Sequence, residues 1–161
     1  MGREIRVAML GTGFIAGFRA QVYAKIPDVK VVSVLGRDMA RTKKFAEENQ
    51  IYYAATTFAD LLKGPDFEAV DICLPNNLHL EMAVKAARSG KHIICEKPLG
   101  RTAAEAQIML QEAENAGIIH CYGENLFFSP DMQEILSIID RGIIGQPLWM
   151  RGREGHSGPH S

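Results

Sequence analysis

The sequence predicts an α/β fold with a doubly wound parallel sheet. Short apolar runs alternate with longer amphipathic runs from residue 5 to about residue 122, and a glycine-rich turn joins the first two. This alternation is typical of repeated strand–helix units. With right-handed crossovers, such a chain binds its ligand at the carboxyl ends of the strands, where the winding direction reverses.

The length and charge of the chain narrow its class. Its 161 residues suffice for one compact domain and a short additional piece. The 18 Lys and Arg residues nearly balance the 19 Asp and Glu residues, and no basic run is present. No apolar run approaches the roughly 18 residues of a membrane span, and charges interrupt the first ten residues. We therefore expect a cytoplasmic protein whose partners include neither nucleic acid nor a membrane.

Short apolar runs and longer amphipathic runs predict the individual strands and helices. Apolar runs predict strands at residues 5–10, 30–35, 69–74, 92–95 and 118–122, and a weaker one near 51–54. Amphipathic runs predict helices at about 14–26, 38–49, 57–63, 78–89 and 102–116. Residues suited to cap a helix precede four of these: Asp38, Thr57, Asn77 and Thr102.

The chain changes character after residue 123. A helix is predicted at about 130–141, and the following GIIGQPLWMRGREGHSGPHS indicates a turn, one strand and a Gly-rich loop. A lone strand cannot bury Leu148 and Trp149. We therefore expect a dinucleotide-binding domain at 4–123. Residues 124–161 are then the helix and first strand of a truncated α+β domain for substrate binding or oligomerisation, with a flexible tail as the alternative.

The three cysteines, Cys73, Cys95 and Cys121, each lie in or at the end of a predicted strand. An odd, widely spaced set is typical of reduced core thiols. A metal-binding thiol cluster is the alternative, but no CxxC pair supports it. No metal site is predicted.

A dinucleotide fingerprint follows the first predicted strand and opens the first helix. Gly11 allows the tight turn, Gly13 lets the backbone approach a pyrophosphate, and Ala16 allows close helix–strand packing. The pyrophosphate is expected on the free N–H groups of the helix. The predicted cofactor-binding residues of this turn are Gly11, Thr12, Gly13, Phe14 and Ile15.

The end of the second strand bears on the choice of coenzyme. An acid here usually binds the ribose 2′-hydroxyl of NAD, but this chain has Gly36-Arg37-Asp38. Glycine leaves room for a 2′-phosphate, with which Arg37 and Arg41 can pair. The sequence thus favours NADP, with NAD as the alternative because Asp38 could reach the hydroxyl. Otherwise Asp38 caps the second helix.

Leu74-Pro75-Asn76-Asn77-Leu78-His79 ends the strand predicted at 69–74. Its backbone is expected to line the nicotinamide-ribose side of the crevice, and Leu74, Pro75, Asn76, Asn77 and His79 are assigned to the cofactor site. For the His79 side chain, bracing of the loop is favoured over catalysis.

The strand predicted at 92–95 ends in Cys95-Glu96-Lys97-Pro98, and this Glu-Lys-Pro is the most specific signal in the chain. Together with the fingerprint, the PNNLH loop and the later ENLFFSP and IIGQP segments, it resembles the N-terminal half of the Gfo/Idh/MocA oxidoreductases. That family includes glucose–fructose oxidoreductase and inositol dehydrogenases. Lys97–Pro98 is also a candidate for a cis bond.

The resemblance implies a nicotinamide-dependent Rossmann oxidoreductase that acts on a sugar or polyol. Lys97 would be the catalytic cation that stabilises charge on the substrate oxygen and would also contact the cofactor, and Glu96 would face the cofactor ribose. Family members carry a catalytic histidine in the second domain, but none can be assigned here. His156 and His160 are candidates to line a substrate cleft, or incidental residues.

One segment departs from the family pattern. Many relatives have Asn-aromatic-Arg-x-x-Pro where this chain has Asn125-Leu126-Phe127-Phe128-Ser129-Pro130. Phe127 replaces the arginine, which removes any polar contact from that position. Asn125 remains a candidate contact of the nicotinamide ribose.

Two functional hypotheses follow. In the first, the chain is the cofactor-binding fragment of a dehydrogenase that moves a hydride between NAD(P) and a sugar or polyol. In the alternative, it is a non-catalytic nucleotide-binding or assembly module. Its exposed IIGQPLWM segment would then join a partner or form a homo-oligomer.

Overall fold

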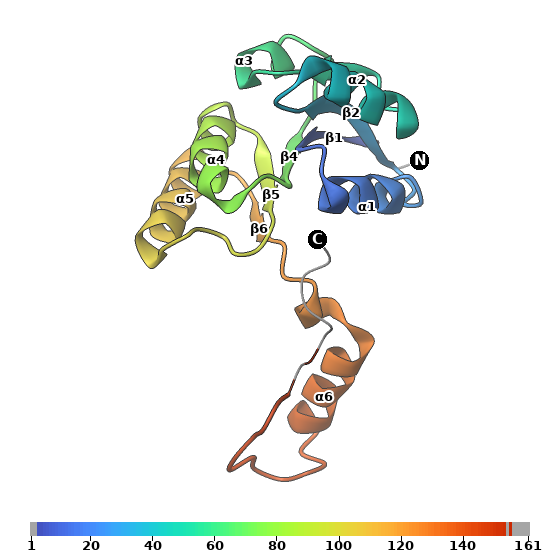
Figure 1. The fold of residues 1–161 in the computed structure, drawn as a ribbon. Helices are drawn as coiled ribbons and strands as arrows, with labels where there is room; N and C mark the ends of the chain where they lie inside the picture. The colour runs from blue at the N-terminus through green and yellow to red at the C-terminus, as the bar shows by residue number, and fades with distance from the viewer. Residues whose placement is uncertain (1–2, 154, 156–161) are drawn as a thin grey trace. The chain divides into compact units, whose positions relative to one another are not determined.

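The computed structural model describes residues 3–153 and 155, so His156 and His160 lie outside the described residues. The chain divides into two compact units between Gly123 and Glu124 (Figure 1). The first unit contains a six-stranded sheet, and the second contains a helix with its flanking segments.

All pairs in the sheet are parallel, and the strand order is β3-β2-β1-β4-β5-β6. The central β1 has β2 on one side and β4 on the other, so the winding direction reverses between β1 and β4. This confirms the doubly wound fold class. The strands are β1 (Ile5–Leu10), β2 (Val29–Leu35), β3 (Tyr53–Ala55), β4 (Ala69–Ile72), β5 (His92–Cys95) and β6 (His120–Tyr122).

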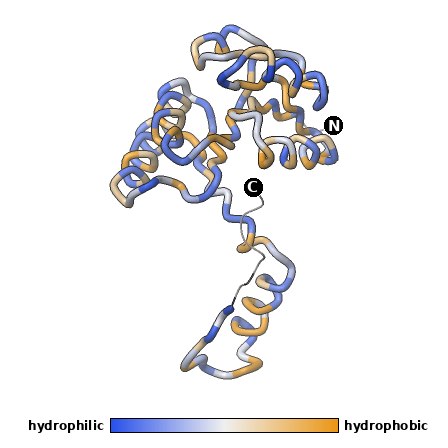
Figure 2. Tube along the Cα trace, in the orientation of Figure 1, coloured by the Kyte–Doolittle hydropathy of each residue, from blue (hydrophilic) through white to orange (hydrophobic). Residues whose placement is uncertain are grey.

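Helices cover both faces of this sheet (Figure 1). Met9 and Val34 pack with residues of α1 and α2 on one face, and Val70 and Ile72 pack with residues of α3, α4 and α5 on the other. Orange apolar positions follow the strands inside the unit in Figure 2. The helices are α1 (Phe14–Tyr23), α2 (Met39–Glu48), α3 (Phe58–Leu61), α4 (His79–Arg88) and α5 (Ala103–Ala116).

Three of the four predicted helix caps are confirmed. Asp38, Thr57 and Thr102 each accept a hydrogen bond from the backbone N–H three residues later. The prediction for Asn77 is wrong, because Leu78 stands at the N-cap of α4. Asn77 lies instead in the 3-10 helix η1 (Asn76–Leu78), closed by a 2.9 Å hydrogen bond from Leu78 N to Pro75 O. That turn leads the chain directly into α4.

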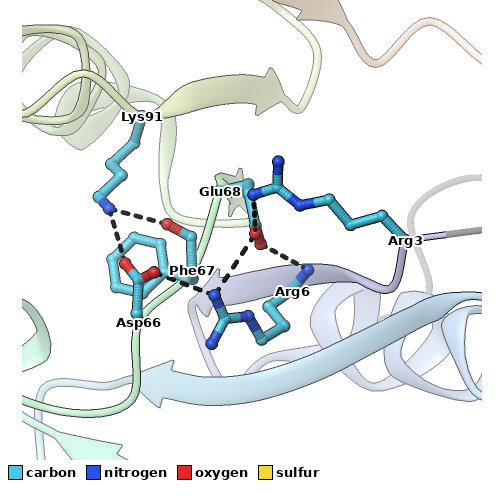
Figure 3. A network of polar contacts seen from close by, with 6 residues as sticks. All are labelled: Arg3, Arg6, Asp66, Phe67, Glu68 and Lys91. Carbon is cyan, nitrogen blue, oxygen red and sulfur yellow. Dashed lines mark hydrogen bonds and ion pairs between the residues drawn. The ribbon is translucent and has the colours of Figure 1, made fainter.

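Ion pairs join the strand starts at the amino edge of the sheet (Figure 3). The backbone N–H of Arg6 on β1 donates to Glu68 before β4 at 2.8 Å. Ahead of β5, Lys91 donates to the Phe67 carbonyl at 2.8 Å, and its ammonium lies 4.8 Å from the Phe67 ring centre. The other ion pairs of this amino-edge cluster are Arg3–Glu68, Arg6–Asp66, Arg6–Glu68 and Lys91–Asp66.

The three thiols are unpaired but differ in burial. Cys95 is buried, Cys73 is half-buried and Cys121 is exposed. Burial raises the pKa of the Cys95 thiol to about 12. The prediction of a core position is therefore wrong for Cys121, because β6 is the last strand at its edge of the sheet.

The second unit contains the 3-10 helix η2 (Leu126–Phe128) and α6 (Pro130–Asp140). No residue of α6 is buried, although apolar positions follow it in Figure 2. The strand predicted after α6 is wrong, since residues 146–153 form none. A single strand has no backbone partner there, and Leu148, Trp149 and Met150 are exposed. Among the described residues, no helix is both long and apolar enough to cross a membrane.

His120 on β6 should make stability fall on mild acidification. Both ring nitrogens are buried without a hydrogen-bond partner among the described residues. Burial lowers the pKa of His120 below its usual 6.5. The unfolded chain then binds a proton more readily than the folded chain. This contribution to the free energy of unfolding is therefore complete above the unfolded-state value of 6.5 and is lost as the pH falls from there through the lower pKa of the folded state. Urea unfolding between about pH 7.5 and 5.5 should show a smaller decline for His120→Phe than for the wild type, and parallel profiles would contradict this.

Candidate cofactor site

The turn after β1 is built around Gly11. Its φ of +123° is a conformation that side chains disfavour, and an added Cβ would lie 2.4 Å from the carbonyl oxygen of Cys73. The Gly11 N–H also donates to Leu35 O at 2.8 Å. Gly11 therefore holds the ends of β1, β2 and β4 close together at the carboxyl edge.

The start of α1 leaves its backbone donors without a capping side chain. Its N-cap is Gly13, and no acidic residue lies in its first turn, whereas side chains cap α2, α3 and α5. A Cβ added at Gly13 would meet no atom within 4 Å. Open space therefore lies beside Gly13, and no side chain caps the first N–H groups of α1, which suits an anion. The side chains of Phe14 and Ile15 are exposed.

The end of β2 has no room for a side chain at Gly36. An added Cβ would lie 2.3 Å from Thr42 Oγ1 and 2.9 Å from Thr12 Cγ2. Thr42 is fully buried and donates to the Asp38 carbonyl at 2.6 Å. The acid of an NAD-type site therefore cannot stand at position 36 unless Thr42 moves.

The charged residues after Gly36 lie on the surface. Arg37, Asp38 and Arg41 are exposed. Asp38 Oδ1 accepts the Arg41 N–H at 2.8 Å, which confirms its capping role. The Arg41 guanidinium lies 3.4 Å from Thr12 O. Two guanidinium groups thus flank the Gly36 turn.

A cavity of about 290 Å³ joins these segments at the carboxyl edge. Seven predicted residues line it, together with Asp38, Arg41, Cys73 and Leu78. Sequence reasoning did not assign Cys73 or Leu78 to the site, although both adjoin residues that it did assign. The seven predicted residues are Gly11, Thr12, Gly13, Gly36, Arg37, Leu74 and Pro75.

The remaining predicted residues do not line this cavity. Asn76 and Asn77 lie in η1, beside its Leu78 wall. His79 is fully buried. Its Nε2 lies 2.9 Å from Leu74 O and its Nδ1 lies 3.0 Å from Pro98 O. The bracing role predicted for His79 is confirmed, and it links the loops that follow β4 and β5.

Glu96 and Lys97 follow β5, the neighbour of β4, at the same carboxyl edge. Lys97 is exposed, and the Lys97–Pro98 bond is cis, as predicted. The Glu96 carboxylate lies 3.4 Å from Arg19 on α1 and accepts the Lys97 N–H at 3.0 Å. Asn125 lies in the second unit, at the N-cap of η2.

Comparison with known proteins agrees with this geometry. Residues 5–124 match the family described as "Oxidoreductase family, NAD-binding Rossmann fold". The chain belongs to the Gfo/Idh/MocA oxidoreductases. The resemblance noted from the Glu-Lys-Pro turn is thereby confirmed, and so is a nicotinamide coenzyme as the ligand class of this Rossmann domain.

Individual Gfo/Idh/MocA relatives match most of the chain. An uncharacterised Bacillus subtilis oxidoreductase is 33% identical over 91% of this chain and 43% of its own length. The levoglucosan dehydrogenase of Pseudarthrobacter phenanthrenivorans is 32% identical over 93% and 40%. An Agrobacterium radiobacter oxidoreductase, solved with NAD+, L-tartaric acid and magnesium, superposes with a TM-score of 0.86 at 26% identity, over 91% and 43%. The chain thus spans about two fifths of these relatives.

Gfo/Idh/MocA proteins differ in their coenzyme. Two scyllo-inositol 2-dehydrogenases of Bacillus subtilis, both 30% identical to this chain, are named for NADP(+) in one case and NAD(+) in the other. The residues of this chain fit either dinucleotide at the α1 turn.

Proposed function

We propose that this chain is the coenzyme-binding part of an NADP-dependent Gfo/Idh/MocA dehydrogenase that acts on a sugar or polyol. The observation that carries the proposal is the cavity that joins the uncapped start of α1 to the Gly36–Arg37 turn and the end of β4. The substrate class comes from the names of relatives, which include levoglucosan and scyllo-inositol dehydrogenases.

Each part of the site would hold one part of the coenzyme. The N–H groups at the start of α1 would bind the pyrophosphate, and Arg37 and Arg41 the 2′-phosphate. The loop that begins at Leu74 and Pro75 would lie along the nicotinamide ribose.

The chemistry would take place beside Lys97. The nicotinamide, when bound, accepts or supplies a hydride at the substrate carbon. The Lys97 ammonium would stabilise the negative charge that develops on the substrate oxygen. Lys97 is exposed, so it is free to reach a substrate held by the remainder of the enzyme.

Titration of NADPH fluorescence with the 161-residue chain tests the proposal. We expect saturable binding with micromolar affinity. Turnover should be slow, because the chain spans only about two fifths of its relatives. Failure to bind at millimolar chain and coenzyme would refute it.

The preference for NADP depends on the two arginines. Arg37→Ala should weaken NADPH binding roughly 10- to 100-fold, because charge-assisted hydrogen bonds contribute about 1.5–3 kcal/mol each. NADH binding should change less than about twofold, since NADH has no 2′-phosphate for Arg37 to contact. Parallel titrations with both coenzymes measure the ratio.

Lys43→Ala is the matched control for that experiment. Lys43 is exposed on α2, the helix that follows Arg37, and does not line the cavity. Equal losses for NADPH and NADH in Arg37→Ala, or an effect as large in Lys43→Ala, would show that Arg37 does not read the phosphate. The alternative in which Asp38 selects NAD would then be favoured.

A further inference from the structure

A carboxylate lies inside the sheet beneath the Glu-Lys-Pro turn. Asp71 on β4 is fully buried. Its neighbours Val70 and Ile72 pack in the core on the α4 side, and Asp71 contacts α1 on the opposite face. A buried charge is costly unless it is paired and hydrogen-bonded. The residues that pair with Asp71 therefore indicate its structural role.

Both oxygens of Asp71 are held by one face of α1. Arg19 pairs with Oδ1, and the Tyr23 hydroxyl donates to Oδ2 at 2.9 Å. Arg19 and Tyr23 are four residues apart, so they are neighbours on the helix surface. Burial raises the pKa of the Asp71 carboxyl, and the Arg19 guanidinium opposes that rise.

Arg19 also reaches a second carboxylate. Its Nε lies 3.4 Å from Glu96 Oε1, while the other oxygen of Glu96 accepts the Lys97 N–H at 3.0 Å. The side chains of Arg19 and Glu96 are only 20% and 15% exposed. A continuous set of contacts therefore runs from Asp71 through Arg19 and Glu96 to the backbone of Lys97.

Gly123 leaves the space that this arrangement requires. A Cβ at Gly123 would lie 2.9 Å from Arg19 Nη2 and 2.8 Å from Cys95 O. The guanidinium is thus enclosed by β4, β5 and the residue that follows β6. It has little freedom to leave Glu96.

We propose that Arg19, held by Asp71, is a positioning residue that fixes Glu96 and thereby aims Lys97 at the nicotinamide end of the site. The inference rests on the proposed role of Lys97. No ion pair among the described residues engages the Lys97 ammonium, so the backbone from which this side chain starts is the part that the protein can hold in place. Glu96 holds that backbone, and without Arg19 the two carboxylates would repel each other.

The test replaces Asp71 and its two partners on α1 with apolar residues and leaves Glu96 in place. The variant Arg19→Met/Tyr23→Phe/Asp71→Leu removes the fully buried Asp71 charge together with its partners and leaves Glu96 with the Lys97 N–H, so it is expected to fold where Arg19→Met alone would leave Asp71 unpaired. Tyr23→Phe is the matched control, because it removes one contact of Asp71 and leaves the Arg19–Glu96 pair. Arg19→Lys retains the charge and should give an intermediate result.

Two readouts separate positioning from a merely structural role. The triple variant should bind NADPH at least about tenfold more weakly, because Glu96 and Lys97 would lose their predicted contacts with the nicotinamide end. Its affinity for 2′,5′-ADP, which fills only the adenosine end, should change less than about twofold. Hydrogen exchange of the Lys97 amide, followed by NMR, should become faster in the triple variant and stay unchanged in Tyr23→Phe.

The outcomes are distinguishable from failure of the proposed function. If wild-type chain does not bind NADPH, the proposed function fails, and Lys97 amide exchange alone decides whether Arg19 acts through Glu96. Unchanged amide exchange in the triple variant, or equal loss of NADPH and 2′,5′-ADP affinity, would overturn the positioning role.

Discussion

Replacing Gly13 with alanine should abolish tight coenzyme binding while the domain remains as stable as the wild type. The new Cβ would meet no protein atom within 4 Å, and the backbone at Gly13 is extended, which alanine adopts freely. It would, however, enter the space in front of the α1 donors. Loss of two charge-assisted hydrogen bonds predicts at least a roughly 100-fold weaker Kd. NADPH titration and thermal unfolding measure the two effects.

Two further glycines provide the comparison. Gly17→Ala adds a Cβ 3.8 Å from the Phe45 ring, an ordinary contact, and should stabilise α1 by up to about 1 kcal/mol without affecting binding. Gly11→Ala should lower stability as well as binding, because its Cβ would overlap the Cys73 carbonyl. Binding by Gly13→Ala within a factor of about three of wild type would show that no phosphate approaches this turn.

His79→Ala should cost about 3 kcal/mol of stability and weaken coenzyme binding as well. The imidazole is fully buried, and its removal leaves a cavity and takes away the ring N–H that donates to one of two carbonyls, Leu74 O at 2.9 Å or Pro98 O at 3.0 Å. Because it spans the loops after β4 and β5, both loops should loosen together. Urea unfolding measures the stability, and NADPH titration the binding.

His79→Gln separates the two contributions. Glutamine fills much of the volume and can donate to one of the two carbonyls, so an intermediate loss is expected. If His79→Ala lost stability but bound NADPH with wild-type affinity, the brace between the loops would be irrelevant to the site.

The sheet was predictable because its strands are short apolar runs bounded by turn residues. β1 and β5 begin and end where the apolar pattern does. The caps Asp38, Thr57 and Thr102 were also predictable, because their residue types precede the amphipathic runs that form the helices. Asn77 failed as a cap because a 3-10 turn closed by backbone groups precedes α4, and backbone closure leaves no signature in residue type. The strand expected near Leu148 failed because pairing depends on a partner that local sequence does not specify.

The site was predictable where it depends on backbone geometry and less so where it depends on packing. Gly11, Gly13 and Gly36 could be assigned from their spacing after two strands. The Asp71–Arg19 pair could not, since it joins residues 52 positions apart. One signal was available, a lone acid within the apolar run VDICLP, because a charge in a buried strand needs a partner.

The amino-edge cluster in Figure 3 affects how readily this domain can change its coenzyme specificity. Its ion pairs bind the amino ends of the strands, whereas the coenzyme is expected at their carboxyl ends. Randomised libraries at positions 37 and 41 should therefore retain the melting temperature of the parent. Substitutions that change the coenzyme preference of this domain should therefore cost it little stability.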